Sequence, residues 1–339
     1  KMLLSNVGNR MVERDHDTFK KIMTGMSLKA TKWWFDEMKW ELIFLKTRQE
    51  IQGIDLDVRE AYNHSIIGVT ALTLKRKNFF LDGLDFDFNI GYAIGRYGLC
   101  DMAMNRYDWD GNKLPPVSPY GGEQNNYPSD GNNHSKELTS KLNLEYTIDK
   151  HHGVNLNVYF DRNSLRPKDP LMDKALGFQS NFPSRMNTLT LALSYDLTLF
   201  EGRFQNAFTL KNYKFSSHSR SINVYSVSAP EPVSVSKSYF GFNDAMRYKL
   251  TNDWMVKASF NSEVRIPTNE ELIGNGYSIL ASPALKPERT SGVNVGIMYR
   301  HIKQNGGLVE IEFNGFYNQL KDMIRFTPDL IPTMARYRN

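Results

Sequence analysis

The chain has 339 residues, a formal net charge of +5, 40% hydrophobic and 12% aromatic residues. This apolar content excludes an intrinsically disordered chain, and the lack of any apolar run of about 18 residues excludes membrane-spanning helices. The charge is spread along the chain without a basic arm, so no nucleic-acid partner is expected. The single cysteine, Cys100, excludes an internal disulfide framework and a CxxC site.

Apolar residues recur at every second position, which predicts strands with one apolar and one wet face. In the segment 84–94, Leu84, Phe86 and Phe88 alternate with Asp85 and Asp87. The predicted strands are 18–32, 38–49, 65–78, 84–96, 137–149, 153–164, 185–199, 203–216, 238–250, 254–264, 290–302 and 307–320. Most are longer than the roughly 5–6 residues that are usual in soluble sheets. A tilted strand needs about 9–11 residues to cross a bilayer.

Short and long connections alternate along the chain. The short ones carry hairpin residues such as Asp82-Gly83 and Asn252-Asp253, and the long, polar ones are 50–64, 97–136, 165–184, 217–237 and 265–289. In an up-and-down meander all long loops then lie at one end. This asymmetry predicts an all-β fold, an antiparallel up-and-down transmembrane β-barrel. A soluble β-sandwich is the alternative, but sandwiches use short strands and have no reason to sort loops by length.

Aromatic residues gather beside the predicted tight turns. Trp33 and Trp34 lie in the first of these turns, Phe200 lies in another, and Trp254 follows a further one. An interfacial girdle of aromatic side chains at the short-turn end of a membrane barrel predicts this placement.

Three segments near the C-terminal end form a recognisable combination. They read RIPTNEEL at 265–272, SPALKPE at 282–288 and FYNQLKDMI at 316–324. Together they resemble the barrel signature of TonB-dependent outer-membrane receptors, in which R-x-P-T-x-x-E-L is followed by N-P-x-L-K-P-E and then by F-Y-N-x-x-K-D-x-I. Ser282 departs from the usual Asn. The resemblance covers the C-terminal part of the chain closely, and the rest matches only in its strand rhythm.

We expect the first two segments to shape the barrel rim rather than to contact cargo. Proline fixes φ and lacks an N–H group, so prolines end ladder pairing where strands leave the sheet. Lys286 and Glu288 are expected to pair with neighbouring strands. The residues to which we assign this structural role are Arg265, Pro267, Thr268, Glu271, Leu285, Lys286, Pro287 and Glu288.

The resemblance also implies a domain organisation. Receptors of this family have an N-terminal plug inside a barrel of about 22 strands, of which about 12 are predicted here. We therefore expect 1–339 to be a single β-barrel segment without the plug domain or the barrel-closing strands. Such a segment would not form a finished transporter by itself, because open sheet edges are not tolerated in lipid.

The function that the resemblance implies is active import across the outer membrane. Its partners would be the TonB–ExbB–ExbD complex, acting through the plug, the lipid bilayer with its lipopolysaccharide, and a scarce extracellular ligand; no cofactor is expected. Pro287 stands where the glycan-importing, SusC-like subclass tends to have Trp, which favours a siderophore or other iron chelate, haem or cobalamin as the ligand. The alternatives are a passive porin or adhesin-type barrel, a glycan importer and, more weakly, a soluble carbohydrate-binding β-protein.

The sequence offers no motif for catalysis. The sequence contains no Gly-rich phosphate loop, GxSxG or HExxH, so we expect no enzyme, no catalytic residues and no metal site. His64, His134 and His218 fall in or beside predicted large loops, where they could contact an iron chelate or haem, but we expect each to be a solvated loop histidine.

The largest predicted loop, 97–136, is the candidate ligand-binding region. It combines aromatic residues, which stack on ligands, with Asn, Asp and Gly, which supply hydrogen bonds and turns. Loops held on a rigid scaffold often carry binding residues. The candidate ligand-binding residues are Tyr97, Tyr107, Trp109, Tyr120 and Tyr127.

Overall fold

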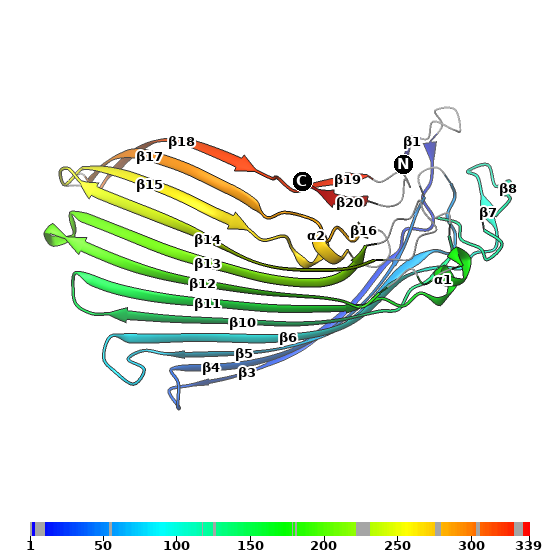
Figure 1. The fold of residues 1–339 in the computed structure, drawn as a ribbon, viewed down its shortest axis with the longest axis horizontal. Coiled ribbons are helices and arrows are strands. Elements are labelled where there is room, and N and C mark those ends of the chain that lie inside the picture. The colour runs from blue at the N-terminus through cyan, green and yellow to red at the C-terminus, as the bar shows by residue number, and fades with distance from the viewer. Residues whose placement is uncertain are drawn as a thin grey trace.

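The computed structural model describes residues 2–3, 11–53, 56–116, 118–124, 127–177, 179, 182–221, 231–274, 279–302, 306–328 and 335–339. Within these ranges a 13-stranded sheet dominates the fold (Figure 1). Its long strands are β3 (Phe19–Thr31), β4 (Glu37–Glu50), β5 (Tyr62–Arg76), β6 (Leu84–Asp101), β10 (Asn133–Thr147), β11 (His152–Arg166), β12 (Ser184–Leu199), β13 (Phe204–Ser221), β14 (Glu231–Lys249), β15 (Trp254–Arg265), β17 (Glu288–Ile302) and β18 (Leu308–Lys321). The short strand β9 (Ser129–Asp130) pairs with β6.

Each long strand pairs antiparallel with the next long strand along the chain, from β3 to β18. The sheet curves into an arch whose two edges are β3 and β18 (Figure 1). Every predicted strand is confirmed, and so is the antiparallel up-and-down order. Tight turns lie at one end of the arch, the turn end, and the longer connections lie at the other, the loop end.

The two faces of the sheet differ in polarity. In β12 the inner face carries Ser194 and Asp196, whereas Leu193 and Tyr195 point to the outer face. Inner-face residues of neighbouring strands form ion pairs, such as Lys75 Nζ with Asp87 Oδ2 at 3.1 Å. The outer face is apolar and exposed; Leu193, for example, is 52% exposed. This division is the one that an outward apolar band and a hydrated interior require.

Three strands extend by at least five residues further toward the loop end than the sequence predicted. β6 ends at Asp101, β13 ends at Ser221, and β14 begins at Glu231. Tyr97 therefore lies in a strand and not in a loop, which corrects its expected position. The physical reason is that alternation of apolar and polar residues marks the lipid-contacting part of a strand, whereas the hydrogen-bond ladder continues beyond it.

Aromatic residues mark the turn end as expected. The rings of Trp33 and Trp34 stack with centroids 4.5 Å apart, and both side chains are 64% exposed. Trp254 packs on Tyr299 of the neighbouring strand at 5.0 Å. Phe200 begins a short 3-10 turn, η2 (Phe200–Gly202). This placement fits an interfacial girdle.

Small elements gather at the loop end. They are β1 (Met2–Leu3), β2 (Met11–Val12), β7 (Arg106–Tyr107), β8 (Lys113–Leu114), α1 (Pro170–Leu176), α2 (Asn269–Ile273), β16 (Ile279–Leu280), β19 (Arg325–Pro328) and β20 (Ala335–Arg338). Among the helices in the described ranges, none is long and apolar enough to span a membrane.

Candidate functional site

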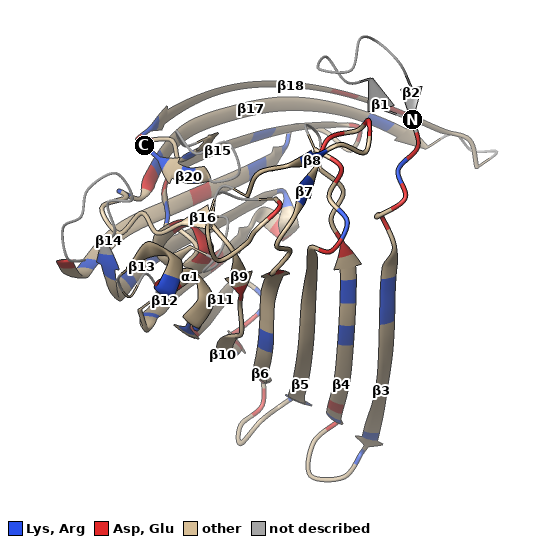
Figure 2. Cartoon of the chain, turned by 90° about the vertical axis from the view of Figure 1, so that its right-hand side faces the viewer, with Lys and Arg blue, Asp and Glu red and all other residues tan. Residues whose placement is uncertain are grey.

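The loop end surrounds the mouth of the arch and is the candidate site. Figure 2 views the molecule from this end, with the long strands leading away from the loops. Two segments border the mouth: the motif loop, residues 266–274 and 279–287, and the aromatic loop, residues 102–116, 118–124 and 127–132. The two are held in place by different contacts.

The motif loop contains α2, whose beginning is specified by its sequence. The Thr268 side chain accepts a hydrogen bond from the Glu271 backbone N–H at 3.3 Å, and the Glu271 carboxylate accepts one from the Thr268 backbone N–H at 2.6 Å. This is a capping box, which satisfies two of the N–H groups that a helix start leaves free. Gly274 ends the helix with φ 70°, a conformation that favours glycine.

Arg265 joins the helix to the sheet. Its guanidinium donates two hydrogen bonds to the Glu271 carboxylate, at 3.0 and 3.1 Å, and a third to Glu288 Oε2 at 2.6 Å. The second Glu288 oxygen accepts from the Ile324 backbone N–H at 2.6 Å. A planar guanidinium suits this forked arrangement, which lysine could not reproduce. Arg265 therefore connects the end of β15, the start of β17 and α2.

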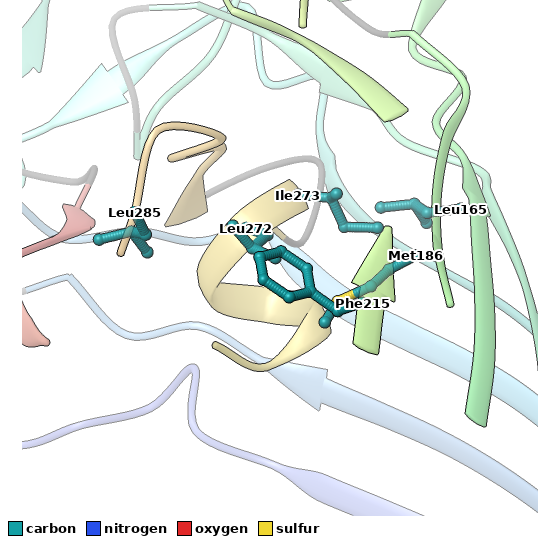
Figure 3. Close-up of a cluster of buried hydrophobic side chains, with 6 residues drawn as sticks. All are labelled: Leu165, Met186, Phe215, Leu272, Ile273 and Leu285. Atoms are coloured by element: carbon teal, nitrogen blue, oxygen red, sulfur yellow. The ribbon is translucent and has the colours of Figure 1, made fainter. Parts of the chain in front are cut away.

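A hydrophobic cluster holds α2 against the inner face of the sheet (Figure 3). Leu272 and Ile273 of the helix are 1% and 5% exposed, and they pack with Phe215 of β13, which is 1% exposed. The cluster also contains Leu165, Met186 and Leu285. Because α2 lies on this face, the motif loop folds into the arch instead of projecting away from it.

The remaining motif residues also lie in structural positions. Pro267 is fully buried, and Pro287 is buried. Lys286 was expected to pair with a neighbouring strand through its side chain. Instead its backbone N–H donates to Asn339 Oδ1 at 2.7 Å, and its side chain has no ion pair in the described part of the chain. Glu288 does pair with the neighbouring strand, through Arg265.

The aromatic loop is held by a buried carboxylate that the sequence analysis missed. Glu123 is 2% exposed. Its carboxylate accepts hydrogen bonds from the backbone N–H groups of Arg59, Glu60 and Ala61, at 3.0, 2.5 and 2.7 Å. One side chain thus joins the aromatic loop to the connection between β4 and β5.

Two more buried carboxylates extend this arrangement. Asp101, which is 0% exposed, accepts from the backbone N–H groups of Glu123 and Gln124. Asp169, which is 3% exposed, accepts from Asp130 N–H at 3.0 Å and caps α1 through Met172 N–H at 3.0 Å. We call Asp101, Glu123 and Asp169 the carboxylate framework. An acidic residue in a polar stretch is normally solvated, so nothing in the sequence marked these three.

The five candidate aromatic residues occupy separate places. Tyr97 lies on the inner face of β6 and packs against the hydrophobic cluster. Tyr107 is covered on one face by the Arg59 guanidinium, 3.8 Å from its ring centroid, and Tyr120 lies beneath Lys174 Nζ at 5.0 Å. Trp109 and Tyr127 are half-buried. Among the described residues no ring contact joins two of the five, so they do not form one stacking platform.

Trp109 lies in the hairpin that joins β7 to β8. The preceding residue, Asp108, accepts hydrogen bonds from the Asn112 side chain at 3.0 Å and from the backbone N–H groups of Asp110 and Asn112 at 2.9 Å. These bonds, that of the Asn112 side chain first, hold the pKa of Asp108 below its ordinary value. The hairpin is therefore ordered by its own side chains.

A cavity of about 610 Å³ lies between the motif loop and the inner face of the strands. Its wall includes Tyr159, Asp161 and Tyr213 from the sheet, and Arg265 and Glu270 from the β15 end and the loop. A second cavity, of about 740 Å³, lies nearer the turn end and is lined by polar residues such as Asp196 and Lys257. Both cavities thus have charged side chains in their walls.

The histidines do not face these spaces. The strand register puts His64, His134 and His218 at outer-face positions, since they stand opposite Arg48, Arg96 and Arg185 and alternate with inner-face residues. At these positions their side chains point away from the mouth of the arch. Within the described ranges, no group of three or more His, Cys, Asp or Glu side chains could hold a metal ion.

The curved antiparallel sheet, its apolar exterior and its polar interior define an outer-membrane β-barrel. A family model described as TonB dependent receptor-like, beta-barrel matches residues 74–339. The chain belongs to this family of receptors and transporters, and its location is the outer membrane.

Solved structures with the same fold agree. The copper transporter OprC superposes with a TM-score of 0.67 at 14% identity, covering 96% of this chain and 48% of that chain. The FrpB iron transporter from Neisseria meningitidis gives 0.59 at 13%, covering 94% and 47%. The ferric yersiniabactin uptake receptor FyuA from Yersinia pestis gives 0.56 at 15%, covering 90% and 46%. No curated protein sequence matches the chain. The chain spans about half the length of these solved relatives.

Proposed function

We propose that this chain is the barrel segment of an outer-membrane receptor that imports a scarce ligand by TonB-coupled active transport. The observation that carries the proposal is the match to the receptor barrel family over residues 74–339. The fold supports it, because the ordered loops gather at one end of a polar interior. In this proposal the plug domain and the barrel-closing strands lie outside the chain, and the TonB–ExbB–ExbD complex supplies the energy through the plug.

For the ligand we propose a metal chelate or a similarly scarce compound rather than a glycan. Three fold neighbours are named as a copper transporter, an iron transporter and a ferric yersiniabactin uptake receptor. Pro287 of this chain stands where Trp tends to occur in glycan importers. The ligand-contacting residues proposed here are Tyr107 and Trp109, in the hairpin farthest along the aromatic loop from the sheet (Figure 1).

The test uses the full-length receptor in cells. A ferric catecholate, a ferric hydroxamate, haem and cyanocobalamin are offered as radiolabelled probes. One of these classes should accumulate, and a protonophore should abolish its accumulation. Accumulation that persists with the protonophore would identify a passive barrel instead. A labelled oligosaccharide is offered in parallel, and uptake of that probe alone would identify a glycan importer.

The binding residues are tested on the same receptor. The double substitution Tyr107→Ala with Trp109→Ala should weaken binding of the accumulated probe by roughly 30-fold or more, as losing aromatic anchors does. The matched control removes two aromatic rings at the opposite end, Trp33→Ala with Trp34→Ala, and should leave affinity unchanged. Unaltered affinity in the first variant would remove this hairpin from the binding site.

A further inference from the structure

One carboxylate lies on the outer face of the sheet, among residues that contact lipid. The outer-face residues of β14 on its turn side are Phe240, Phe242, Asp244, Met246 and Tyr248. Asp244 is the middle one of these five. In the described part of the sheet, the long strands carry one other carboxylate at an outer-face position, Glu50 at the loop end of β4.

The strand register fixes the face to which Asp244 points. Directly opposite residues of an antiparallel pair point to the same side of the sheet. Asp244 stands opposite Phe208 of β13, and Phe208 stands opposite Tyr195 of β12, which lies on the outer face. Since consecutive strand residues point to opposite faces, Asn243 and Ala245 face the interior and Asp244 faces the bilayer.

Phenylalanine rings lie on three sides of this carboxylate. Phe208 and Phe260 stand directly opposite Asp244 on the two neighbouring strands, and Phe242 lies two residues away on the same face of β14. The centroid of the Phe242 ring is 6.4 Å from that of Phe208 and 5.4 Å from that of Phe260. The three rings therefore form one row across β13, β14 and β15, which we call the phenylalanine row.

The protein supplies Asp244 with an amide but not with a cation. The Asn206 side-chain amide donates to Asp244 Oδ1 at 2.5 Å and to the Ala245 backbone carbonyl at 3.2 Å. Among the described residues, no Lys, Arg or His side chain pairs with Asp244. The nearest outer-face cation of β13, Lys214, stands opposite Ser238, six residues from Asp244 along β14.

A charge in this position needs a partner. A carboxylate within the apolar band of a membrane protein is unfavourable, and acyl chains can neither neutralise it nor donate a hydrogen bond to it. On the inner face of the same group of strands, Glu263 pairs with Lys211. The cation that balances Asp244 must therefore come from outside the described chain, and it must be one that enters the apolar band.

A groove on the outer face begins beside the phenylalanine row. Its volume is about 590 Å³, within the roughly 300–1,000 Å³ of small-molecule sites. Asn212 and Ser262 are the polar outer-face residues in its wall. The apolar ones include Leu191, Leu193, Leu210, Phe240 and Phe242. Because Phe242 belongs to both the groove and the row, a hydrocarbon chain lying in the groove has one end next to Asp244.

We propose that Asp244, the phenylalanine row and the groove form a binding site for an amphiphilic ammonium compound, with one cationic group and one hydrocarbon chain. The ammonium group pairs with Asp244 beside aromatic rings, whose faces attract cations. The hydrocarbon chain lies in the groove. The compound reaches the site through the bilayer and not through the mouth, so the site is separate from the import of the ligand.

A second copy of the chain fits this face less well. Two copies that meet through the same face would bring two Asp244 carboxylates together, and like charges repel each other. Neither copy would contribute a cation at that level, since Lys214 lies six residues away. Both N–H groups of the Asn206 amide are already used within one chain.

The test uses the full-length receptor in phosphatidylcholine bilayers and two photoreactive probes. One is a dodecyltrimethylammonium with a diazirine at the end of its chain, and the other is the matched dodecanol. After illumination, peptide mapping measures labelling of the groove residues in β12, β13 and β14. The ammonium probe should label them about 10-fold more than the alcohol at equal concentration. Asp244→Asn should abolish this preference, and Phe260→Leu should reduce it about threefold.

The matched control is Asp196→Asn, which neutralises an inner-face carboxylate of β12 and should be labelled like wild type. Folding of each variant is checked by its heat-dependent mobility on gels, and Phe260→Leu keeps the test decisive if Asp244→Asn does not fold. Equal labelling by the two probes, or an unchanged preference in Asp244→Asn or Phe260→Leu, would overturn the proposal. A native dimer that Asp244→Asn dissociates would also overturn it, because a second copy would then occupy this face.

Discussion

The two loops that border the mouth reach the same ordered state by different physics. The motif loop is held by apolar burial around Leu272 and by the Arg265 fork, which are contacts between side chains. The aromatic loop is held by the carboxylate framework, whose acidic side chains accept from backbone N–H groups. The difference teaches that a loop rich in polar residues can be as firmly fixed as one with a hydrophobic core, provided that its buried acceptors are satisfied.

The largest effect on this comparison is expected from Glu123→Ala. It leaves three backbone N–H groups without their acceptor, at a cost of about 3 kcal/mol or more. Hydrogen exchange at the amides of residues 59–61 should accelerate roughly 100-fold, while exchange in the motif loop should stay unchanged.

Glu60→Ala is the matched control for this variant. Glu60 has an exposed side chain, and its backbone N–H is itself one of the donors, so this substitution should leave exchange unaltered. Wild-type exchange rates in the Glu123→Ala receptor would show that the carboxylate does not hold the loop.

The converse effect is expected from Leu272→Ala. The substitution creates a cavity in the hydrophobic cluster and should destabilise the attachment of the motif loop by about 3 kcal/mol. Exchange should rise at the Gly274 and Ser282 amides, which donate within this loop, and not at residues 59–61.

For this substitution the control is Leu81→Ala, which truncates a leucine that is 48% exposed at the turn end. It should change exchange at neither loop. If Leu272→Ala instead loosened both loops together, the two would form one cooperative unit and the comparison would fail.

The smallest effect concerns pH and the hairpin around Trp109. The pKa of Asp108 is lowered by its hydrogen bonds, so the stability it contributes is present above the ordinary carboxyl pKa of about 3.9 and is lost as pH falls below it. Fluorescence should show an acid transition in this range. The transition should be missing in Asp108→Ala and in Trp109→Phe, which removes the reporter. A transition that persists in Asp108→Ala would assign it to another group.

The sequence predicted the fold well because alternation is a strong signal in strands that contact lipid on one face and water on the other. It predicted the loop-side strand ends poorly. Tyr97 lies in β6 because the ladder runs on to Asp101, beyond the segment in which one face must be apolar. Backbone pairing there does not need a particular side chain, so no pattern marks where it stops.

The candidate site could be predicted only in part, because only contacts that require particular side chains leave a pattern in the sequence. Thr268 and Glu271 form a capping box whose spacing is visible in any sequence. Glu123 meets residues 59–61 more than 60 positions away, and its partners are peptide groups that every residue except proline carries. A contact of this kind leaves no trace in the identity of the partner residues.

That property of the carboxylate framework has a consequence for how the receptor can change over time. Because the donors are peptide N–H groups, the exposed side chains of Arg59, Glu60 and Asp130 can be replaced without altering the bonds beneath them. The three buried acids thus fix the backbone path of these loops, whatever exposed side chains the loops carry. The exposed side chains of these loops can therefore diverge while the backbone path that presents them is kept.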